Sequence, residues 1–208
     1  RAEREARLQT ERAVEGTATA LRSDFERTDE IVSALAGFIM SSENVDRDAY
    51  DRFVGGFLAG HPEIRSMQLL DYVPDAERGV LESRLADVGV SGITEVDPQG
   101  ALTRAPQRDQ YLVTWFDAPE PRSEGGTGVS VLNSAEGDHL VRDMVAAGIS
   151  GGSVSQMIHG PGGEVSGVRL LRPVFDPDLP LTTAADRSAA LVGAAAAVVS
   201  HERVFDEV

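Results

Sequence analysis

Residues 14–40 read VEGTATALRSDFERTDEIVSALAGFIM, and this stretch decides the fold of the first part of the chain. Its apolar and small side chains recur at alternating spacings of four and three residues, which is the heptad period of a helix. One helix is predicted up to about Met40, about 60 Å long at ~1.5 Å per residue. Its later half is expected to pack on its own domain, and its charged first turns to project away. The seam consists of Val14, Ala18, Leu21, Phe25, Thr28, Val32, Leu35 and Ile39.

The charged start at Arg1 carries no capping residue, so we expect the helix to continue from a preceding segment. The same heptad seam can serve as a stalk that pairs with a second copy of the chain. A homodimer through this helix is therefore one expectation, beside the simpler one of a helix lying along its own core.

Helical and strand patterns alternate in the rest of the chain. Apolar residues recur at helical spacing over 47–59, and residues 64–73 are apolar on both faces, as in a central strand. Residues 189–199 fit either an alanine-rich helix or a strand. The order of elements predicts an α+β fold with at least one mainly antiparallel sheet. The other predicted elements are helices over 75–88 and 135–147, strands over 93–96, 111–116 and 129–132, a loop over 117–128, a hairpin of 154–158 with 165–174, and a helical end from Ser200.

Composition excludes several classes of partner. The formal net charge is −15, and all 19 basic residues are arginine because the chain has no lysine. A chain this acidic is not expected to bind nucleic acid or anionic lipid, since both require a basic face. Absence of lysine beside abundant Ala, Gly, Val and Asp indicates the codon usage of a GC-rich bacterium. The 208 residues suffice for one ordinary domain or two small ones, and no cysteine is present.

Sequence motifs for catalysis, metal binding or a cofactor are weak. The four histidines have no ligand spacing, and the glycines at 160–163 lie between two strand patterns without a lysine, which favours a turn over a phosphate loop. A hydrolase would need Ser153 or Ser155 close to His159. No cofactor, no metal and no catalytic residue are therefore predicted, and the enzyme stays a minor alternative.

Three aromatic residues fall within six positions, at Tyr111, Trp115 and Phe116, and Asp117 and Glu120 follow them. An aromatic strand that runs into a loop with carboxylates can line a small ligand site. An aromatic core strand that ends at a loop is an equally good interpretation.

The order of several short strings resembles the CHASE family, the extracellular sensor domains of receptor histidine kinases and nucleotide cyclases, including the plant cytokinin receptors. The similarity covers nearly the whole chain. The strings are Pro62 to Leu70, Glu77-Arg78 with Glu82, Asp109-Gln110-Tyr111 running into Trp115-Phe116, Gly128 before a strand, Ala147-Gly148 at a helix end, Arg172-Pro173-Val174-Phe175, and Ala190-Leu191-Val192-Gly193.

This resemblance implies a stalk helix over 1–45, a membrane-distal PAS-like subdomain over 46–175, and a membrane-proximal PAS-like subdomain formed by 176–208 with part of the stalk. It implies transmembrane helices on both sides of the chain in the native protein and makes 191–199 a strand. In the family, a carboxylate after the aromatic strand and a hydroxyl residue line the ligand site. Asp117 or Glu120 would supply the carboxylate here, and Ser153 or Ser155 the hydroxyl. The full expected set is Met67, Leu69, Tyr111, Val113, Trp115, Asp117, Glu120, Ser153 and Ser155.

The function expected from the sequence is that of an extracytoplasmic sensor in a bacterial cell-membrane receptor. It would bind an unknown small molecule in the distal subdomain and signal through a dimeric stalk to a cytoplasmic kinase or cyclase. The alternative is an ectodomain that dimerises or binds a protein without any small ligand.

Overall fold

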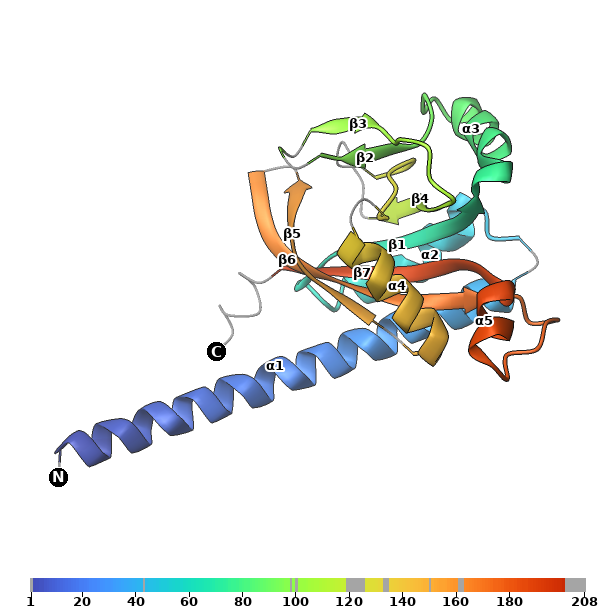
Figure 1. Ribbon diagram of the computed structural model, residues 1–208. Coiled ribbons are helices and arrows are strands. Elements are labelled where there is room, and N and C mark those ends of the chain that lie inside the picture. Colours follow the sequence, from blue (N-terminus) through green and yellow to red (C-terminus); the bar gives the residue numbers. More distant parts are fainter. Residues whose placement is uncertain are drawn as a thin grey trace.

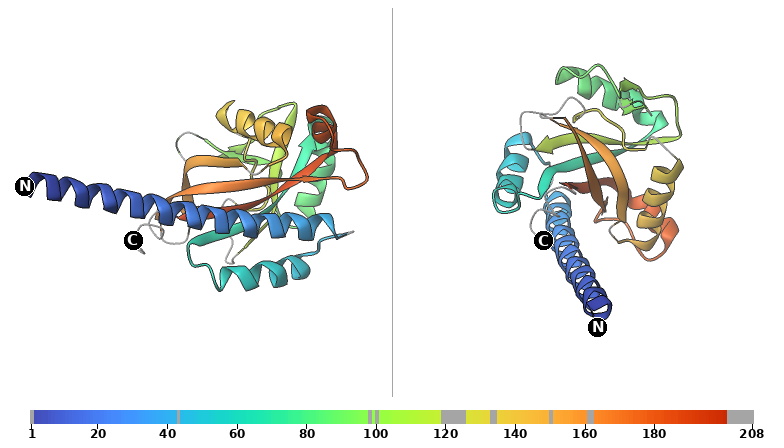
Figure 2. Two further views of the ribbon diagram at one scale, coloured as in Figure 1. Left: turned by 90° about the horizontal axis from the view of Figure 1, so that it is seen from below. Right: turned by 90° about the vertical axis from the view of Figure 1, so that its left-hand side faces the viewer.

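The computed structural model describes residues 2–42, 44–97, 99, 101–118, 126–132, 135–149, 151–160 and 163–200. A long helix, α1 (Ala2–Met40), extends to one side of a body built on a twisted sheet, and the last strand ends on that same side (Figure 1). Helices cover both faces of the sheet (Figure 2). The α+β class, the long first helix and the mainly antiparallel sheet are thus confirmed.

The 39 residues of α1 form one continuous helix, about 58 Å long at ~1.5 Å per residue. Val14 is 62% exposed, whereas Val32 and Leu35 are fully buried. The later half of the seam therefore packs inward, as predicted, while the first turns stand clear of the body (Figure 2). Pairing of the exposed part with a second copy stays a prediction.

Helix α2 (Arg47–Leu58) begins at Asp46, whose carboxylate accepts a hydrogen bond from the backbone N–H of Ala49 at 2.7 Å. This satisfies one of the N–H groups that a helix leaves free at its start. Tyr50 and Val54 on its inner face are buried in one apolar cluster with the later half of α1. The two helices therefore cover the same face of the sheet.

Five strands form the main sheet in the order β4-β1-β7-β6-β5, and every neighbouring pair is antiparallel. The strand predicted over 64–73 lies inside the sheet, and the alternative of an alanine helix over 189–199 is excluded because those residues form most of β7. The strands are β1 (Ile64–Pro74), β4 (Gln110–Ala118), β5 (Gly151–Gly160), β6 (Gly163–Phe175) and β7 (Leu191–Ser200).

Strand β7 occupies the centre of this sheet, between β1 and β6. The boundary predicted at residue 175 does not separate two sheets, because β7 pairs along most of its length with strands from the other side of that boundary. Four successive alanines, residues 194–197, let helices approach the strand from both faces. Gly193 is required where β7 meets β1, since a Cβ there would lie 2.2 Å from the carbonyl oxygen of Leu70.

The β4 edge carries a smaller lobe. A 3-10 turn, η1 (Asp75–Glu77), leads into α3 (Arg78–Asp87), and β2 (Thr94–Val96) pairs with β3 (Leu102–Arg104). The strand predicted over 129–132 is reduced to bridges, from Val129 to Thr94 and from Ser130 to Val113. Strand β3 was not predicted from the sequence.

Helices α4 (Ala135–Ala147) and α5 (Ala184–Ala190) cover the face opposite α1. The bounds predicted for α4 are correct. Helix α5 was not predicted from the sequence, although Thr183 and Asp186 form the reciprocal capping box of a helix start. The helix predicted from Ser200 lies outside the described residues.

Candidate functional site

The register of the sheet separates its two faces, because residues opposite each other on neighbouring strands point to the same side. Met67 and Leu69 lie opposite Ala197 and Ala195 and pack beneath α1 and α2. Gln68, between them, points to the other side together with its partner Asp117 on β4. One face thus carries the apolar core beneath α1 and α2. The other carries the apolar core beneath α4 and α5 and, beside it, the polar side chains of Gln68 and Asp117.

Asp117 is the centre of a polar cluster on this second face. Its Oδ1 accepts a hydrogen bond from the hydroxyl of Ser66 at 2.6 Å, and its Oδ2 accepts one from Nε2 of Gln68 at 3.4 Å. Asp117 is 6% exposed and Gln68 is 5% exposed, so both polar groups are withdrawn from water. We call Ser66, Gln68, Asp117 and Arg169 the Asp117 cluster.

Arg169 joins the cluster from β6, two strands away from Ser66. It pairs with Val198, which pairs with Ser66, so all three side chains share a face. Burial lowers the pKa of Arg169 to about 10, and the charge of Asp117 opposes that shift. Burial raises the pKa of Asp117, while hydrogen bonds from Ser66 and Gln68 and the charges of Arg169 and Arg47 act in the opposite direction. The cluster therefore holds two opposite charges in a poorly hydrated place.

Two acceptors on this face have no hydrogen-bond partner within the part of the chain that the structure describes. They are Oε1 of Gln68 and the hydroxyl of Ser200, the latter in a residue without any exposed surface. Ser200 lies opposite Gly167, one row beyond Val198 on the same side of β7. Buried polar atoms of this kind are uncommon, because leaving one unsatisfied costs about 1–3 kcal/mol. The cluster can thus accept hydrogen bonds from a bound donor.

The structure divides the residues expected to line the site. Met67 and Leu69 belong to the core under α1 and α2, and Tyr111 and Val113 belong to a separate core under α3. The residues expected from the sequence therefore do not share one surface. These four lie in apolar cores, whereas Asp117 belongs to the polar cluster. A bulge between Leu69 and Leu70, together with the alternation of the strands, produces this division.

Trp115 is half-buried between two cores, and the guanidinium of Arg84 lies 4.3 Å from its ring centroid. Glu120 lies outside the described residues. Ser153 pairs with Arg169 across β5 and β6, which places its backbone beside the cluster, and Ser155 is on the same strand. The side chains of both serines also lie outside the described residues.

Ser66, Gln68 and Arg169 were missed in the sequence analysis. Ser66 and Gln68 are polar residues at alternate positions of a strand that otherwise reads as apolar, and this alternation was the available signal. Arg169 is one of several arginines in the chain, and only the pairing of β6 with β7 shows that it faces Asp117. Sequence spacing alone carries no such information.

Strand geometry also bears on the hydrolase alternative. Ser155 and His159 are four residues apart on β5, and Ser153 is two residues further away. At ~3.3 Å per residue this separates Ser155 from His159 by about 13 Å along the strand, too far for a nucleophile and its base. Among the described residues there is also no group of three His, Cys, Asp or Glu side chains that could hold a metal ion.

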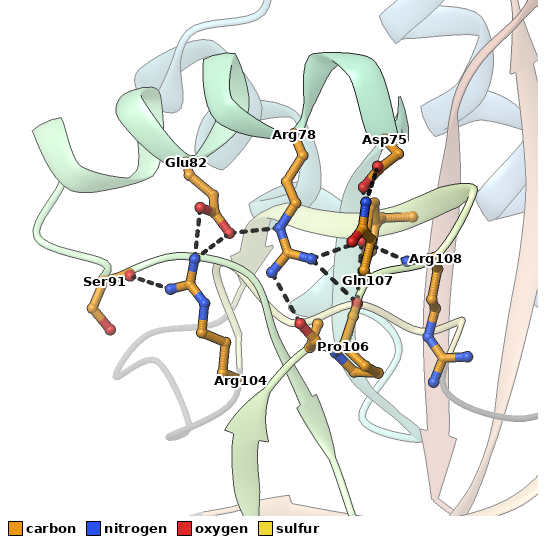
Figure 3. A network of polar contacts seen from close by, with 10 residues as sticks. Asp75, Arg78, Glu82, Ser91, Arg104, Pro106, Gln107 and Arg108 are labelled. Atoms are coloured by element: carbon orange, nitrogen blue, oxygen red, sulfur yellow. Dashed lines mark hydrogen bonds and ion pairs between the residues drawn. The ribbon is translucent and has the colours of Figure 1, made fainter.

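A second polar network holds α3 against the rest of the smaller lobe (Figure 3). The guanidinium of Arg78 donates to Oε1 of Glu82 at 2.9 Å, to the Ala105 carbonyl oxygen at 2.9 Å and to the Tyr111 hydroxyl at 2.7 Å. Arg104 donates to both oxygens of the same glutamate. These are the Arg and Glu positions of the helix string that the resemblance rested on, and their contacts stabilise the lobe.

Comparisons with known proteins agree with the resemblance seen in the sequence. The CHASE domain family model matches residues 43–208. A comparison with curated proteins finds no match. Among the described residues, no helix combines the length and the apolar character that a membrane span requires.

Two solved structures resemble the chain, and the first of them shares its fold. The extracellular domain assigned to the histidine kinase mmHK1S-Z3 is 17% identical, with a TM-score of 0.50 over 97% of this chain, which spans 62% of that chain's length. Methyl-accepting chemotaxis protein X is 12% identical, with a TM-score of 0.44, over 96% of this chain and 67% of its own. Because the family match extends over most of the 208 residues, the chain belongs to the CHASE family of extracellular sensor domains.

Proposed function

We propose that this chain is the extracytoplasmic sensor of a bacterial transmembrane receptor and that it binds a small molecule at the Asp117 cluster. The observation that carries the proposal is the buried Oε1 of Gln68, which has no partner among the described residues and lies on the same face as Asp117. A ligand with N–H or O–H groups could donate to both residues and offset the cost of burying them.

The charges of the cluster limit the ligand class. Asp117 and Arg169 sense each other's charge, and the charge of Arg47 also acts on Asp117, so the cluster offers neither the several carboxylates of a metal site nor a purely basic surface. A small polar organic molecule fits this environment better than a metal ion or a polyphosphate. The serine of β5 that lies opposite Arg169, Ser153, is proposed to contribute its hydroxyl.

The signal is proposed to leave the domain through α1. The beginning of α1 and the end of β7 point to the same side of the body (Figure 1), which suits a chain held between two transmembrane helices. A dimer of the α1 stalks, built around the exposed part of the seam, would pass a shift of the sheet to a cytoplasmic histidine kinase or cyclase. We propose that the sheet and its helices act as a PAS-like module in this two-component type of receptor.

A thermal-shift screen of small metabolites tests the binding proposal. At a concentration of about 100 times Kd, a ligand should stabilise the folded chain by about 2.7 kcal/mol, which raises Tm by several degrees. The Asp117→Asn variant should lose this shift. Asp71→Asn is the matched control, because Asp71 is a carboxylate on the adjacent strand that pairs with Arg84 on α3, outside the cluster. A screen without any stabilising compound, or a hit that Asp117→Asn binds equally well, would contradict the proposal.

A ligand-free dimerising ectodomain is the second candidate. It is favoured by the first half of α1, where Val14 and Ala18 are exposed at heptad spacing. Sedimentation of the wild type and of Val14→Asp distinguishes the two. A stable dimer that Val14→Asp dissociates, together with an empty ligand screen, would favour this candidate.

A further inference from the structure

Strand β6 carries different kinds of side chain on the two faces of the sheet. Arg169 lies opposite Val198 and faces the Asp117 cluster. Leu170, the next residue, lies opposite Ala197 and packs against the apolar core that contains Val32 and Leu35 of α1. One strand thus carries, at successive positions, a charged member of the cluster and a packing contact of the stalk helix.

The link between Arg169 and Asp117 crosses the sheet. Two strands, β1 and β7, separate β4 from β6, and at the rows of Asp117 and Arg169 the β7 residues on this face are Ala196 and Val198. Both are fully or almost fully buried, so the space above the central strand is poorly hydrated. Charges interact more strongly where water is excluded, because there is less screening. Asp117 and Arg169 therefore share a poorly hydrated part of this face, with the central strand between them.

The opposite side of β6 bears directly on α1. Helix α1 packs on β6 and β7, and Thr28, Val32 and Leu35 are buried in this contact. Arg172 adds an ion pair, with its Nη1 lying 3.9 Å from Oδ2 of Asp29 on α1. Both side chains are partly exposed, so this pair contributes little energy, and the apolar packing is the main connection.

We propose that β6 couples the Asp117 cluster to the stalk, so that the state of Asp117 sets how tightly residues 28–36 of α1 are held on the sheet. This regulation rests on the proposed function, because it makes a ligand at Asp117 the input. Arg169 is the positioning residue that senses Asp117, and the packing of Leu170 on α1 is the output. Helix α3, by contrast, packs mainly on β1 and on the apolar core of the smaller lobe in the part of the chain that the structure describes.

Amide hydrogen exchange of the ligand-free domain tests the coupling without a known ligand. Asp117→Asn removes the charge with little change in shape and should accelerate exchange in residues 28–36 by about tenfold. Arg169→Gln should have the same effect, which keeps the test valid if one of the two variants does not fold. Asp71→Asn is the control: it removes a carboxylate paired with Arg84, 3.3 Å away. It should accelerate exchange in α3 and leave residues 28–36 within about twofold of the wild type.

The coupling is overturned if both cluster variants leave exchange in residues 28–36 within about twofold, or if Asp71→Asn accelerates these residues as much as Asp117→Asn does. The ligand screen separates this failure from that of the proposed function. A metabolite that requires Asp117, with α1 unresponsive, would leave the binding site standing and refute the coupling. A responsive α1 with no stabilising metabolite would support the coupling and refute the sensor function.

Discussion

The hydroxyl of Ser66 donates a hydrogen bond to Oδ1 of Asp117 at 2.6 Å, although 51 positions separate the two residues in sequence. The contact joins the beginning of β1 to the end of β4, where the two strands pair. It places a carboxylate and its donor on the sheet face that α1 and α2 leave uncovered. Several expectations depend on this contact.

Ser66→Ala should destabilise the domain, because it leaves a buried carboxylate without its shortest hydrogen bond. Hydrogen bonds to charged groups contribute about 1.5–3 kcal/mol, so a loss of that order is expected in urea unfolding at pH 7. Ser33→Ala is the matched control, since the Ser33 hydroxyl donates to a neutral acceptor, the Asp29 carbonyl oxygen within α1. Its effect should remain below about 0.5 kcal/mol. Equal losses of unfolding free energy in both variants would show that the Ser66 hydrogen bond contributes no more than one within a helix.

The stability of the domain should depend on pH through Asp117. Burial raises the pKa of Asp117 in the folded state, so the folded chain keeps this proton to a higher pH than the unfolded chain does. The resulting stabilisation is complete below the unfolded pKa, about 3.9, and is lost as the pH rises through the folded pKa. Asp117→Asn cannot titrate. The difference in unfolding free energy, wild type minus Asp117→Asn, should therefore fall as the pH rises across this window.

Asp186 should give the opposite pH dependence of stability in the same measurement. Hydrogen bonds from the backbone and side chain of Thr183 lower the pKa of Asp186. Its stabilisation is present above the unfolded pKa and is lost as the pH falls through the folded value. The difference in unfolding free energy, wild type minus Asp186→Asn, should therefore rise with pH. The corresponding difference for Asp117→Asn should fall. Parallel slopes for both variants would contradict the assignment of the two environments.

Local patterns in the sequence were sufficient for most helices and strands. The heptad seam gave α1, and the flanking residues gave α4 with correct bounds. Both patterns depend on neighbours within a few residues, which is the range over which helix periodicity acts. The strand 191–199 needed the family resemblance, because an alanine run has helical propensity and only the central position of β7 in the sheet overrides it.

The site was predictable only in part, for a topological reason. Asp117 was identified because it follows an aromatic strand, and this is a local signal. Its partners Ser66 and Arg169 come from β1 and β6, and their proximity depends on the strand order β4-β1-β7-β6. Met67 and Leu69 were also expected in the site, but they point to the opposite face of β1 from Gln68, and alternation alone does not say which face carries the site.

Two glycines should respond in opposite ways to the same substitution. Gly193→Ala would place a Cβ 2.2 Å from the carbonyl oxygen of Leu70, so β7 would have to separate from β1 at the centre of the sheet. A loss of at least about 3 kcal/mol, or failure to fold, is expected. Gly55→Ala, at an exposed position of α2, meets nothing within 4 Å and should stabilise the domain by about 0.5–1 kcal/mol. Thermal unfolding of the two variants measures both, and a tolerated Gly193→Ala would contradict the central position of β7.

Arg78→Lys tests whether the α3 network needs a guanidinium. The five donors of Arg78 form a planar group that reaches Glu82, the backbone at 105–106 and Tyr111 at once, and it lies 5.0 Å from the centroid of the Tyr111 ring. A lysine ammonium is a point charge and cannot keep these directions together. A loss of about 1–2 kcal/mol is therefore expected in urea unfolding, because at least one buried acceptor loses its donor.

The location of the effect distinguishes the loss of these contacts from a general effect of replacing arginine by lysine. Arg52→Lys, at an exposed position of α2, is the control and should change stability by less than about 0.5 kcal/mol. Hydrogen exchange in Arg78→Lys should increase in residues 104–108, which the guanidinium holds against α3, and should stay unchanged in residues 28–36 of α1. If the two lysine variants behave alike, the Arg78 contacts do not hold the lobe, and the apolar core of Leu81, Leu85 and Ile93 alone keeps α3 in place.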